Sequence, residues 1–312
     1  MLRLGVATRI LGHDRLRNAG VHQAEAGTHV SLRLLRVCEV LRYLQAHHIG
    51  FYRLPEDLLA AEDSAGAMLA QRAAADMFGE AGALARSAAI RLTVHSALSS
   101  ALGTAAPDVA ARAGQVVGLQ AALLDALGAG AESVVVLHVG GASDDRAAAI
   151  ERFAARFERL APAVRRRIAV EHDDTRFGLF DVLRLHRITG VPVVFDALHL
   201  QLHNPERIGL AEALSLALAT WPPGVRPEVH FSTQRTEAHM QPQSRGAPHV
   251  LAPRPGQHSD YLNPFEFIAL LNAARGLPPF DIMLEAKAAD LALLRLRTDL
   301  QRYAPELASR VQ

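Results

Sequence analysis

The chain has 312 residues, of which 50% are hydrophobic, and its formal net charge is +1. This length is enough to bury a large core without disulfides, and α/β barrels of this size fold as one domain. The near-neutral charge excludes a strongly basic protein that coats nucleic acid, although it allows a local basic patch. The single cysteine, Cys38, excludes a disulfide framework and a thiolate metal cluster. Lys287 is the only lysine among 33 Lys and Arg residues.

Neither a membrane span nor a secretion signal is predicted. The sequence contains no run of 18 apolar residues, and its first ten residues, MLRLGVATRI, lack the apolar core of a signal peptide. We therefore expect a cytoplasmic protein without a membrane partner, and the sequence leaves its oligomeric state open.

Apolar, β-branched runs alternate with Ala- and Leu-rich helical stretches along the whole chain. The predicted strands are Leu2–Val6, Gly50–Leu54, Ala89–His95, Ser133–Gly140, Arg167–Glu171, Val191–Asp196, Glu228–Ser232 and Asp281–Glu285. The predicted helices cover 31–48, 63–87, 107–128, 144–160, 178–189, 208–219, 264–275 and 287–302. Almost continuously apolar strands such as VPVVFDAL are typical of parallel sheets that are covered on both faces. Eight such units in succession predict an α/β fold, a (β/α)8 TIM barrel that forms a single domain over 1–312.

An open doubly wound nucleotide-binding sheet fits less well, because no G-x-G-x-x-G follows the first strand and no phosphate-loop motif is present. The segment Thr233–Asn263 is rich in Pro, Gln, Ser, His and Gly and is too long for an ordinary connection. We expect 233–263 to be a long loop over the barrel mouth, and the polar segment Ala7–Gly27 to lie there as well.

Metal-competent side chains stand at the ends of six consecutive predicted strands. They are His95, His138, Glu171, Asp196 followed by His199, Glu228 with His230, and Glu285. In a TIM barrel the C-terminal strand ends surround the active-site mouth, so these side chains should converge. One His alone is often structural and one Asp is often a helix cap, but several carboxylates buried together must be paired or bound to metal.

The predicted ligands offer oxygen and imidazole nitrogen and no sulfur. This composition suits Mn²⁺, Zn²⁺, Fe²⁺ or Co²⁺ better than Mg²⁺ or Ca²⁺. The set is larger than one ion needs, so we expect two or three divalent ions, with manganese first and zinc, iron or cobalt as alternatives. Such clusters activate water at a phosphoryl centre, and they also serve sugar isomerases.

Taken in order, several segments resemble the UV-damage endonuclease family, whose members are metal-dependent barrels related in architecture to xylose isomerase. The segments are FYRL at Tyr52 and Arg53, VLHVGG at His138, VEHDD at Glu171, VVFDALH at Asp196 and His199, EVHFSTQ at His230, GQHSDY at His258, and DIMLEAK at Glu285 and Lys287. The resemblance implies that the metal-competent residues at the strand ends are metal ligands, namely His95, His138, Glu171, Asp196, His199, His230 and Glu285. Glu228 is the exception, because the family commonly has Lys at its position. The resemblance also adds His258 as a ligand and places Lys287 near substrate phosphate. Glu228 can still ligate as a carboxylate, and Lys287 and Glu228 are the candidate catalytic residues.

The sequence departs from the family pattern where a damaged base pair would be probed. The family follows its third-strand His with a Pro-x-Gln motif and often an aromatic residue, whereas this chain has His95-Ser96-Ala97-Leu98-Ser99. Leu98 can act as an apolar wedge against a distorted duplex, but it cannot hydrogen-bond a base as Gln does. His172 stands where the family usually has Asn, and we expect it in the shell around the ligands.

Three hypotheses for the function follow. The first is a metal-dependent phosphodiesterase that nicks damaged duplex DNA, with Arg53, Arg235 and Lys287 on the phosphates. The second is a small-molecule metalloenzyme, such as a sugar isomerase, an epimerase or an iron-dependent oxidative enzyme, with the 233–263 loop folded over its substrate. The third is a non-catalytic barrel that binds a partner through the 31–48 helix, although packing against the barrel explains the apolar face of that helix better.

Overall fold

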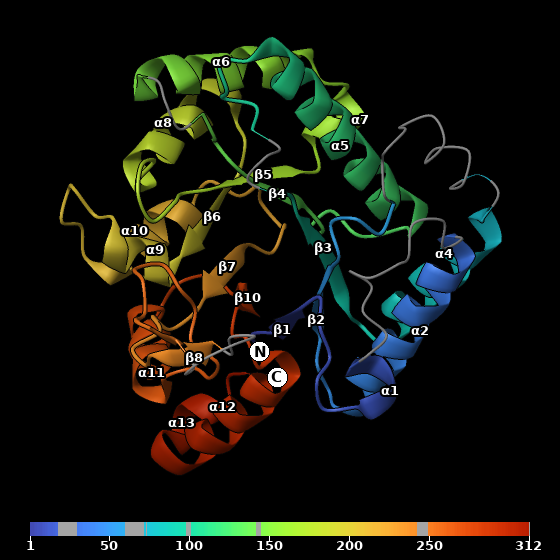
Figure 1. The fold of residues 1–312 in the computed structure, drawn as a ribbon, viewed down its shortest axis with the longest axis vertical. Coiled ribbons are helices and arrows are strands. Elements are labelled where there is room, and N and C mark those ends of the chain that lie inside the picture. Colours follow the sequence, from blue (N-terminus) through green and yellow to red (C-terminus); the bar gives the residue numbers. More distant parts are fainter. Residues whose placement is uncertain are drawn as a thin grey trace.

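A computed structural model of the chain describes residues 1–17, 30–59, 72, 74–97, 101–141, 145–241 and 249–311. Eight parallel strands close into a barrel in the order β1-β10-β7-β6-β5-β4-β3-β2 (Figure 1). The strands are β1 Leu4–Ala7, β2 Phe51–Leu54, β3 Arg91–His95, β4 Val135–His138, β5 Ile168–Glu171, β6 Val193–Asp196, β7 Glu228–Phe231 and β10 Asp281–Leu284. All eight predicted strands are present, and the predicted TIM barrel is confirmed.

Helices surround the barrel (Figure 1). The longer ones are α2 Val30–Ala46, α4 Ala75–Ser87, α5 Pro107–Ala126, α6 Arg146–Arg159, α8 Leu179–Thr189, α10 Leu210–Leu218, α11 Pro264–Ala273 and α12 Ala289–Tyr303. The shorter ones are α1 Asp14–Arg17, α7 Pro162–Arg165, α9 Ala197–Leu202 and α13 Pro305–Ala308. The longer helices match the predicted ones, except that most of the expected first half of the 63–87 helix lies outside the described residues. Within the described ranges, none of the helices has the length and apolarity that crossing a bilayer requires.

The barrel strands are buried on both faces, as their apolar runs predicted. Every residue of β2, β5, β6, β7 and β10 is buried. The α2 helix packs its apolar face inward, since Leu34, Val37 and Leu41 are fully buried while Leu32 and Leu35 are exposed. Packing against the barrel therefore accounts for most of the apolar pattern of this helix.

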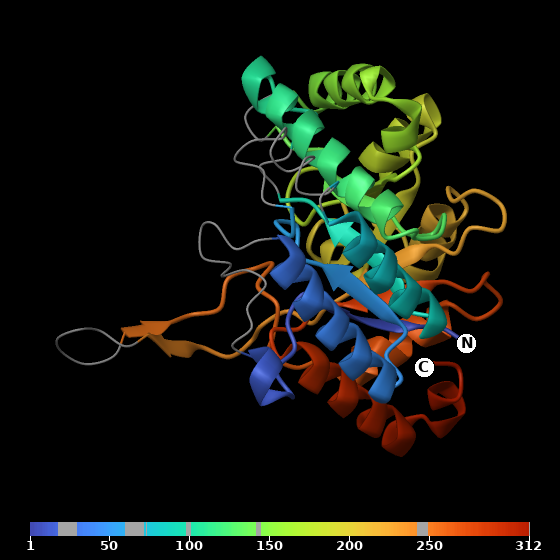
Figure 2. The same ribbon diagram turned by 90° about the vertical axis from the view of Figure 1, so that its right-hand side faces the viewer.

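The segment predicted as a loop over 233–263 contains two short antiparallel strands, β8 His239–Gln241 and β9 His249–Leu251. Figure 2 shows this hairpin projecting away from the barrel, on the side opposite the two chain termini. Its strands are only three residues long and are flanked by Pro, Gln and Gly, so the sequence carried no clear period-two signal for them.

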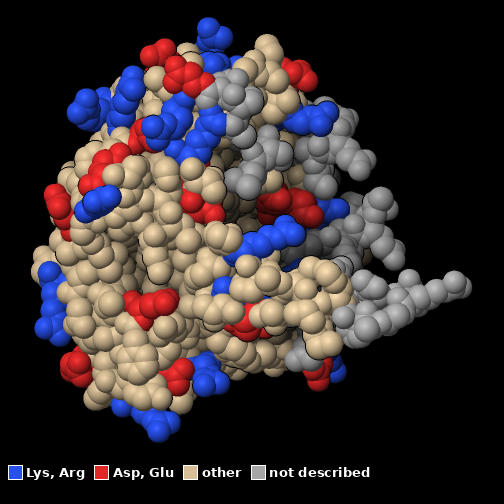
Figure 3. All heavy atoms as spheres, turned by 60° about the vertical axis from the view of Figure 1, so that its left-hand side comes forward, with Lys and Arg blue, Asp and Glu red and all other residues tan. Residues whose placement is uncertain are grey.

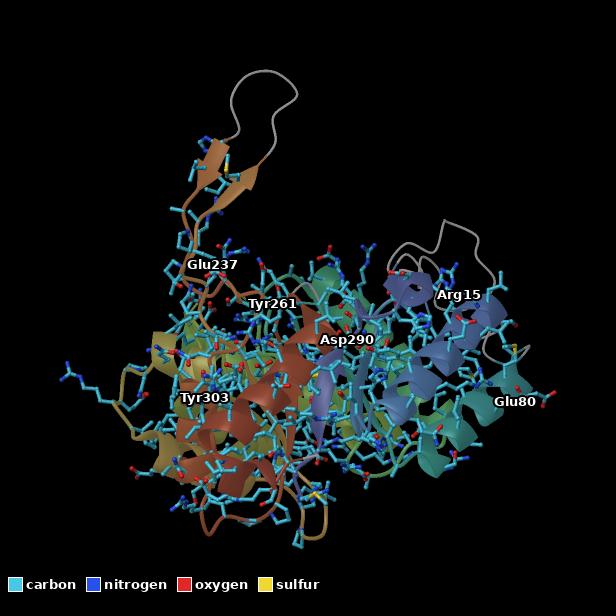
Figure 4. The ribbon with its side chains drawn as sticks, turned by 90° about the horizontal axis from the view of Figure 1, so that it is seen from below. Arg15, Glu80, Glu237, Tyr261, Asp290 and Tyr303 are labelled. Atoms are coloured by element: carbon cyan, nitrogen blue, oxygen red, sulfur yellow. The ribbon has the colours of Figure 1, made fainter. Side chains whose placement is uncertain are left out.

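The chain after β1 is fixed by a buried carboxylate of α12. Asp290 accepts hydrogen bonds from the backbone nitrogens of Leu11, at 2.6 Å, and Gly12, at 3.0 Å, and from the Tyr43 hydroxyl, at 2.7 Å. Figure 4 shows Asp290 of α12 towards the side of the protein body from which the hairpin projects. The beginning of the predicted Ala7–Gly27 segment is thus anchored to the last long helix, while its residues 18–27 lie outside the described residues.

We predict opposite effects for two glycines of α4. A Cβ at Gly82 would lie 1.9 Å from the carbonyl oxygen of Leu127, whereas a Cβ at Gly79 would meet nothing within 4 Å. Gly82→Ala should therefore lower the free energy of unfolding by about 1–3 kcal/mol through overpacking. Gly79→Ala should raise it by about 0.5–1 kcal/mol through helix propensity. Urea unfolding of both variants tests this, and a shift of the same sign in both would contradict it.

Candidate metal centre

Four imidazoles surround one buried carboxylate at the carboxyl end of the barrel strands. Glu171, the last residue of β5, is 1% exposed. Its Oε2 lies 2.8 Å from His95 Nε2 and 3.4 Å from His138 Nε2. Its Oε1 lies 2.8 Å from His230 Nδ1 and 3.4 Å from His199 Nδ1. Residues from β3, β4, β5 and β7 and from α9 therefore meet in one cluster, because parallel strands of a barrel end at the same mouth.

Three overlapping groups of described residues could each hold a metal ion. They are His95 with His138 and Glu171, Glu171 with Asp196 and His199, and Asp196 with His230 and Glu285. Within each group the ligand atoms lie within 4.8 Å of one another. Glu171 and Asp196 belong to two groups each, so the groups form one continuous chain of candidate ligands.

Two buried polar atoms of the residues in these three groups have no hydrogen-bond partner in the described part of the protein. They are Asp196 Oδ2 and His138 Nδ1. A buried carboxylate oxygen without a donor is costly, and a cation at this place would remove the cost. Together with the oxygen and imidazole donors of the three groups, the free oxygen of Asp196 fits a divalent ion of the manganese, zinc, iron or cobalt type.

Backbone carbonyls orient two of the candidate ligands. His199 Nδ1 lies 2.8 Å from the carbonyl oxygen of His172, and His95 Nδ1 lies 3.0 Å from that of Ser96. A ring whose Nδ1–H donates to a carbonyl presents Nε2 as its metal-binding atom. The His172 ring is itself buried and accepts a hydrogen bond from the Asp196 backbone nitrogen at 3.0 Å, and burial lowers its pKa to about 3. His172 therefore stays neutral and lies directly behind the ligands.

Glu228, the first residue of β7, lies deeper in the barrel than the three groups and belongs to none of them. Its side chain is fully buried, with Oε1 3.1 Å from His230 Nε2 and Oε2 3.3 Å from Arg91 Nη2. The Thr93 hydroxyl donates to Oε1 at 3.4 Å. The period-two spacing of Glu228 and His230 does place both side chains inside the barrel. Glu228, however, contacts Nε2 of the His230 ring, whereas Nδ1 of that ring faces Glu171.

Arg53 of β2 is buried inside the cluster. Its Nη1 donates to Glu285 Oε1, and its Nη2 lies 2.8 Å from His230 Nε2. The guanidinium is thus a fixed positive charge beside two candidate ligands, and the predicted phosphate contact of Arg53 stays a prediction. His258, which entered through the resemblance, lies at the edge, with Nδ1 3.8 Å from Glu285 Oε2.

The remaining predicted residues lie around the mouth. Lys287 is exposed, and its backbone nitrogen donates to the carbonyl oxygen of Ser259 at 3.1 Å. Arg235 is mostly buried at the foot of the hairpin, with Nη2 3.6 Å from Asp260 Oδ1. Leu98 lies outside the described residues. Figure 3 shows acidic and basic side chains next to one another where the surface is hollowed beside the hairpin.

The charges of the cluster compensate one another. Burial alone would raise the pKa of Glu171, but the imidazoles of His230 and His138 hold this pKa well below its ordinary value. Burial alone would lower the pKa values of the two rings nearest Glu171 Oε1, but Glu171 raises the pKa of His230 to about 10. Asp196 and Glu171 raise the pKa of His199 to about 9, whereas burial lowers the pKa of His138 to about 4. Without metal, the rings of His199 and His230 are therefore protonated on both nitrogens and positively charged at neutral pH.

Sequence reasoning missed two residues that support the site, Arg91 and Thr93. Both lie on β3, Arg91 four and Thr93 two residues before His95, so all three side chains point into the barrel. A charged residue at such a position inside an apolar strand was the available signal, because a buried arginine needs a carboxylate partner.

The UV-endonuclease UvdE family model matches residues 16–309. The chain belongs to this family. It is 28% identical over 225 residues to the UV DNA damage endonuclease of Bacillus velezensis, covering 72% of this chain and 66% of that protein. The match to the enzyme of the same name from Clostridium perfringens is 26% identical and covers 71% of this chain and 50% of that protein. The chain thus spans less than two thirds of these two relatives, whereas a 27% identical match covers 84% of this chain and 78% of the Bacillus cereus (strain G9842) protein.

Solved structures share the fold of this family member. The crystal structure of SacUVDE has a TM-score of 0.78 at 24% identity and covers 97% of this chain and 99% of that chain. An L-ribulose 3-epimerase has a TM-score of 0.58 at 13% identity, covering 92% of this chain and 82% of that chain. A D-psicose 3-epimerase from Clostridium cellulolyticum has a TM-score of 0.56 at 11% identity, and the match covers 91% of this chain and 85% of that chain. These likenesses show a barrel shared by proteins of different names.

We predict that divalent metal binding releases protons from this site. His199 and His230 have raised pKa values of about 9 and about 10, so at neutral pH an ion must displace protons from these candidate ligands. Manganese affinity should therefore rise as the pH increases from 6.5 towards 9. Titration calorimetry in buffers of different ionisation enthalpy measures the protons released. An affinity that is independent of pH over this range, with no proton release, would contradict the prediction.

Proposed function

We propose that the chain is a metal-dependent endonuclease that hydrolyses a phosphodiester bond of damaged duplex DNA. The observation that carries this proposal is the unbroken chain of three candidate metal groups, joined through Glu171 and Asp196, in a member of the UvdE family. The relatives are named UV DNA damage endonucleases, which supports DNA as the substrate. We propose that the site binds two or three divalent ions, with Mn²⁺ as the favoured ion.

In this proposal the ligands are His95, His138, Glu171, Asp196, His199, His230 and Glu285, with His258 at the edge of the site. Divalent ions held there supply Lewis acidity, which activates water and neutralises charge on the phosphoryl group. The chain's own part is orientation. The carbonyl oxygens of His172 and Ser96 fix two imidazoles, and Arg53 holds Glu285 in place.

We assign Glu228 a positioning role at His230. A carboxylate that accepts a hydrogen bond from the second nitrogen of a ligand histidine fixes the ring and raises its basicity. Arg91 and Thr93 hold Glu228 in this place. Lys287, exposed beside the mouth, is the proposed contact for substrate phosphate.

Nothing in the described part of the chain favours the two other hypotheses. A small-molecule enzyme would use the 233–263 segment as a cover, but the hairpin in this segment stands away from the barrel (Figure 2). A non-catalytic barrel would not need several carboxylates and imidazoles buried together at its mouth, because burying such groups without a role is costly.

Glu171→Gln should abolish activity, because it removes a carboxylate that two groups share and that all four imidazoles contact. Nicking of UV-irradiated or abasic plasmid with Mn²⁺ should fall by more than about a hundredfold. Glu151→Gln, the same change on the exposed side of α6, is the matched control and should nick like the parent protein. Metal-loaded parent protein that cleaves neither plasmid would overturn the proposed function, and equal activity of the two variants would overturn the site.

Glu228→Gln should weaken metal binding without removing a ligand. We expect manganese affinity to fall by about 10- to 100-fold at unchanged stoichiometry. Titration calorimetry gives the affinity and metal analysis gives the stoichiometry, again beside Glu151→Gln. Loss of a whole equivalent of metal would instead make Glu228 a ligand, as the sequence analysis predicted. An unchanged manganese affinity would contradict the positioning role that we assign to Glu228.

A further inference from the structure

The β8–β9 hairpin carries an apolar pair that nothing else in the described part of the protein covers. Met240 lies directly opposite Val250 in the antiparallel register, so the two side chains lie on the same face. They are 64% and 60% exposed. The hairpin forms a sheet of two strands only, and it projects clear of the barrel (Figures 2 and 4). An isolated ribbon gains little stability from such a pair, so the pair needs another explanation.

The foot of the hairpin is tied to the candidate metal centre. The Arg235 backbone nitrogen donates to the Gln257 carbonyl at 2.7 Å, and a bridge joins Gln234 to His258. The side-chain amide of Gln234 also donates to the Arg254 carbonyl at 2.9 Å. His258 in turn faces Glu285 of the cluster. The hairpin therefore stands at a fixed place relative to any phosphate that reaches the metal ligands.

Exposed cations lie at this foot, beside the carboxylates of Glu237 and Asp260. Lys287 and Arg254 are exposed, and the backbone of Lys287 is bonded to Ser259, which follows His258. In Figure 4, Glu237 marks the foot of the hairpin, with Tyr261 below it on the body of the protein. A ribbon that exposes an apolar pair and has cations at its base is complementary to a nucleic-acid groove, which has apolar sugar and base edges between rows of phosphates.

We propose that the hairpin is a duplex-DNA contact that enters the major groove next to the bond that is cut. This inference rests on the proposed function. The major groove, about 12 Å wide, admits a two-stranded β-ribbon, whereas the minor groove is about half as wide. Met240 and Val250 contact base edges and thymine methyl groups there, and Lys287 and Arg254 contact the flanking phosphates. The hairpin thereby sets the position of the duplex over the metal centre.

The double variant Met240→Ser/Val250→Ser tests this contact. Leu35→Ser/Ile188→Ser, at two similarly exposed positions on α2 and α8, is the matched control. We expect affinity for a fluorescent duplex with an abasic site, measured with the Mn²⁺-loaded protein by anisotropy, to fall about tenfold in the hairpin variant only. Hydrolysis of bis(p-nitrophenyl) phosphate and the thermal midpoint should match those of the control, because neither depends on the hairpin.

A second duplex locates the contact in the groove. Replacing thymine by uracil removes only the major-groove methyl groups. The parent protein should bind this duplex more weakly, and the hairpin variant should bind both duplexes equally.

Each adverse result has a distinct meaning. If the parent nicks damaged DNA and both double variants bind the duplex alike, the hairpin inference alone is wrong. If the hairpin variant loses affinity but is equally sensitive to the missing methyl groups, the major-groove contact is wrong. If the parent hydrolyses the small phosphodiester but binds no duplex, the proposed function and the inference both fail. A change from dimer to monomer on sedimentation, without loss of duplex affinity, would make the pair a contact between two copies of the chain.

Discussion

The burial of Glu171 is the constraint on which the rest of the site depends. A carboxylate at 1% exposure is tolerated inside a barrel only when positive charge or donors surround it. Four imidazoles from separate elements meet this need. Two of them, His199 and His230, are positively charged at neutral pH because the buried carboxylate raises their pKa values. The same arrangement that stabilises the metal-free protein therefore prepares a metal site, since an ion can take over the positive charge of those rings.

A second layer of buried, mutually compensating charges lies below the cluster, towards the other end of the barrel. Arg91 contacts both Glu228 and Asp281, and Asp281 also accepts from Arg3. Arg91 is further packed over the rings of Phe51 and Trp221, with its guanidinium carbon 4.9 Å and 5.8 Å from their centroids. A guanidinium held by two carboxylates and two rings has little freedom to move. Glu228 is therefore a rigid support for His230, and not a free acid inside the barrel.

The sequence was enough to predict the barrel and the convergence of its strand ends. Short apolar runs mark parallel strands, and a polar residue that closes such a run, as Glu171 and Asp196 do, must lie at the mouth. The sequence was not enough to separate the candidate ligands from the residues that contact them from deeper in the barrel. Glu228 and His230 have equivalent positions in the alternating pattern, and only the register of β7 with β6 and β10 shows that Glu228 lies deeper. Arg53 was predicted only as a phosphate contact, because its partners Glu285 and His230 are far away in the sequence.

The position of the hairpin bears on how a member of this family reads its substrate when the familiar probing residues are replaced. The segment after His95 lacks the Gln and the aromatic residue that resemblance to the family leads one to expect, and Leu98 lies outside the described residues. Contacts to phosphates alone position DNA without reading its sequence or its damage. An element that reaches into a groove has to come from elsewhere in the chain. Among the described residues, the β8–β9 hairpin projects away from the barrel, and its foot is joined to His258, which lies 3.8 Å from Glu285 of the candidate metal centre. The proposed duplex contact would therefore be coupled to the orientation of the reacting phosphate through His258 and Ser259.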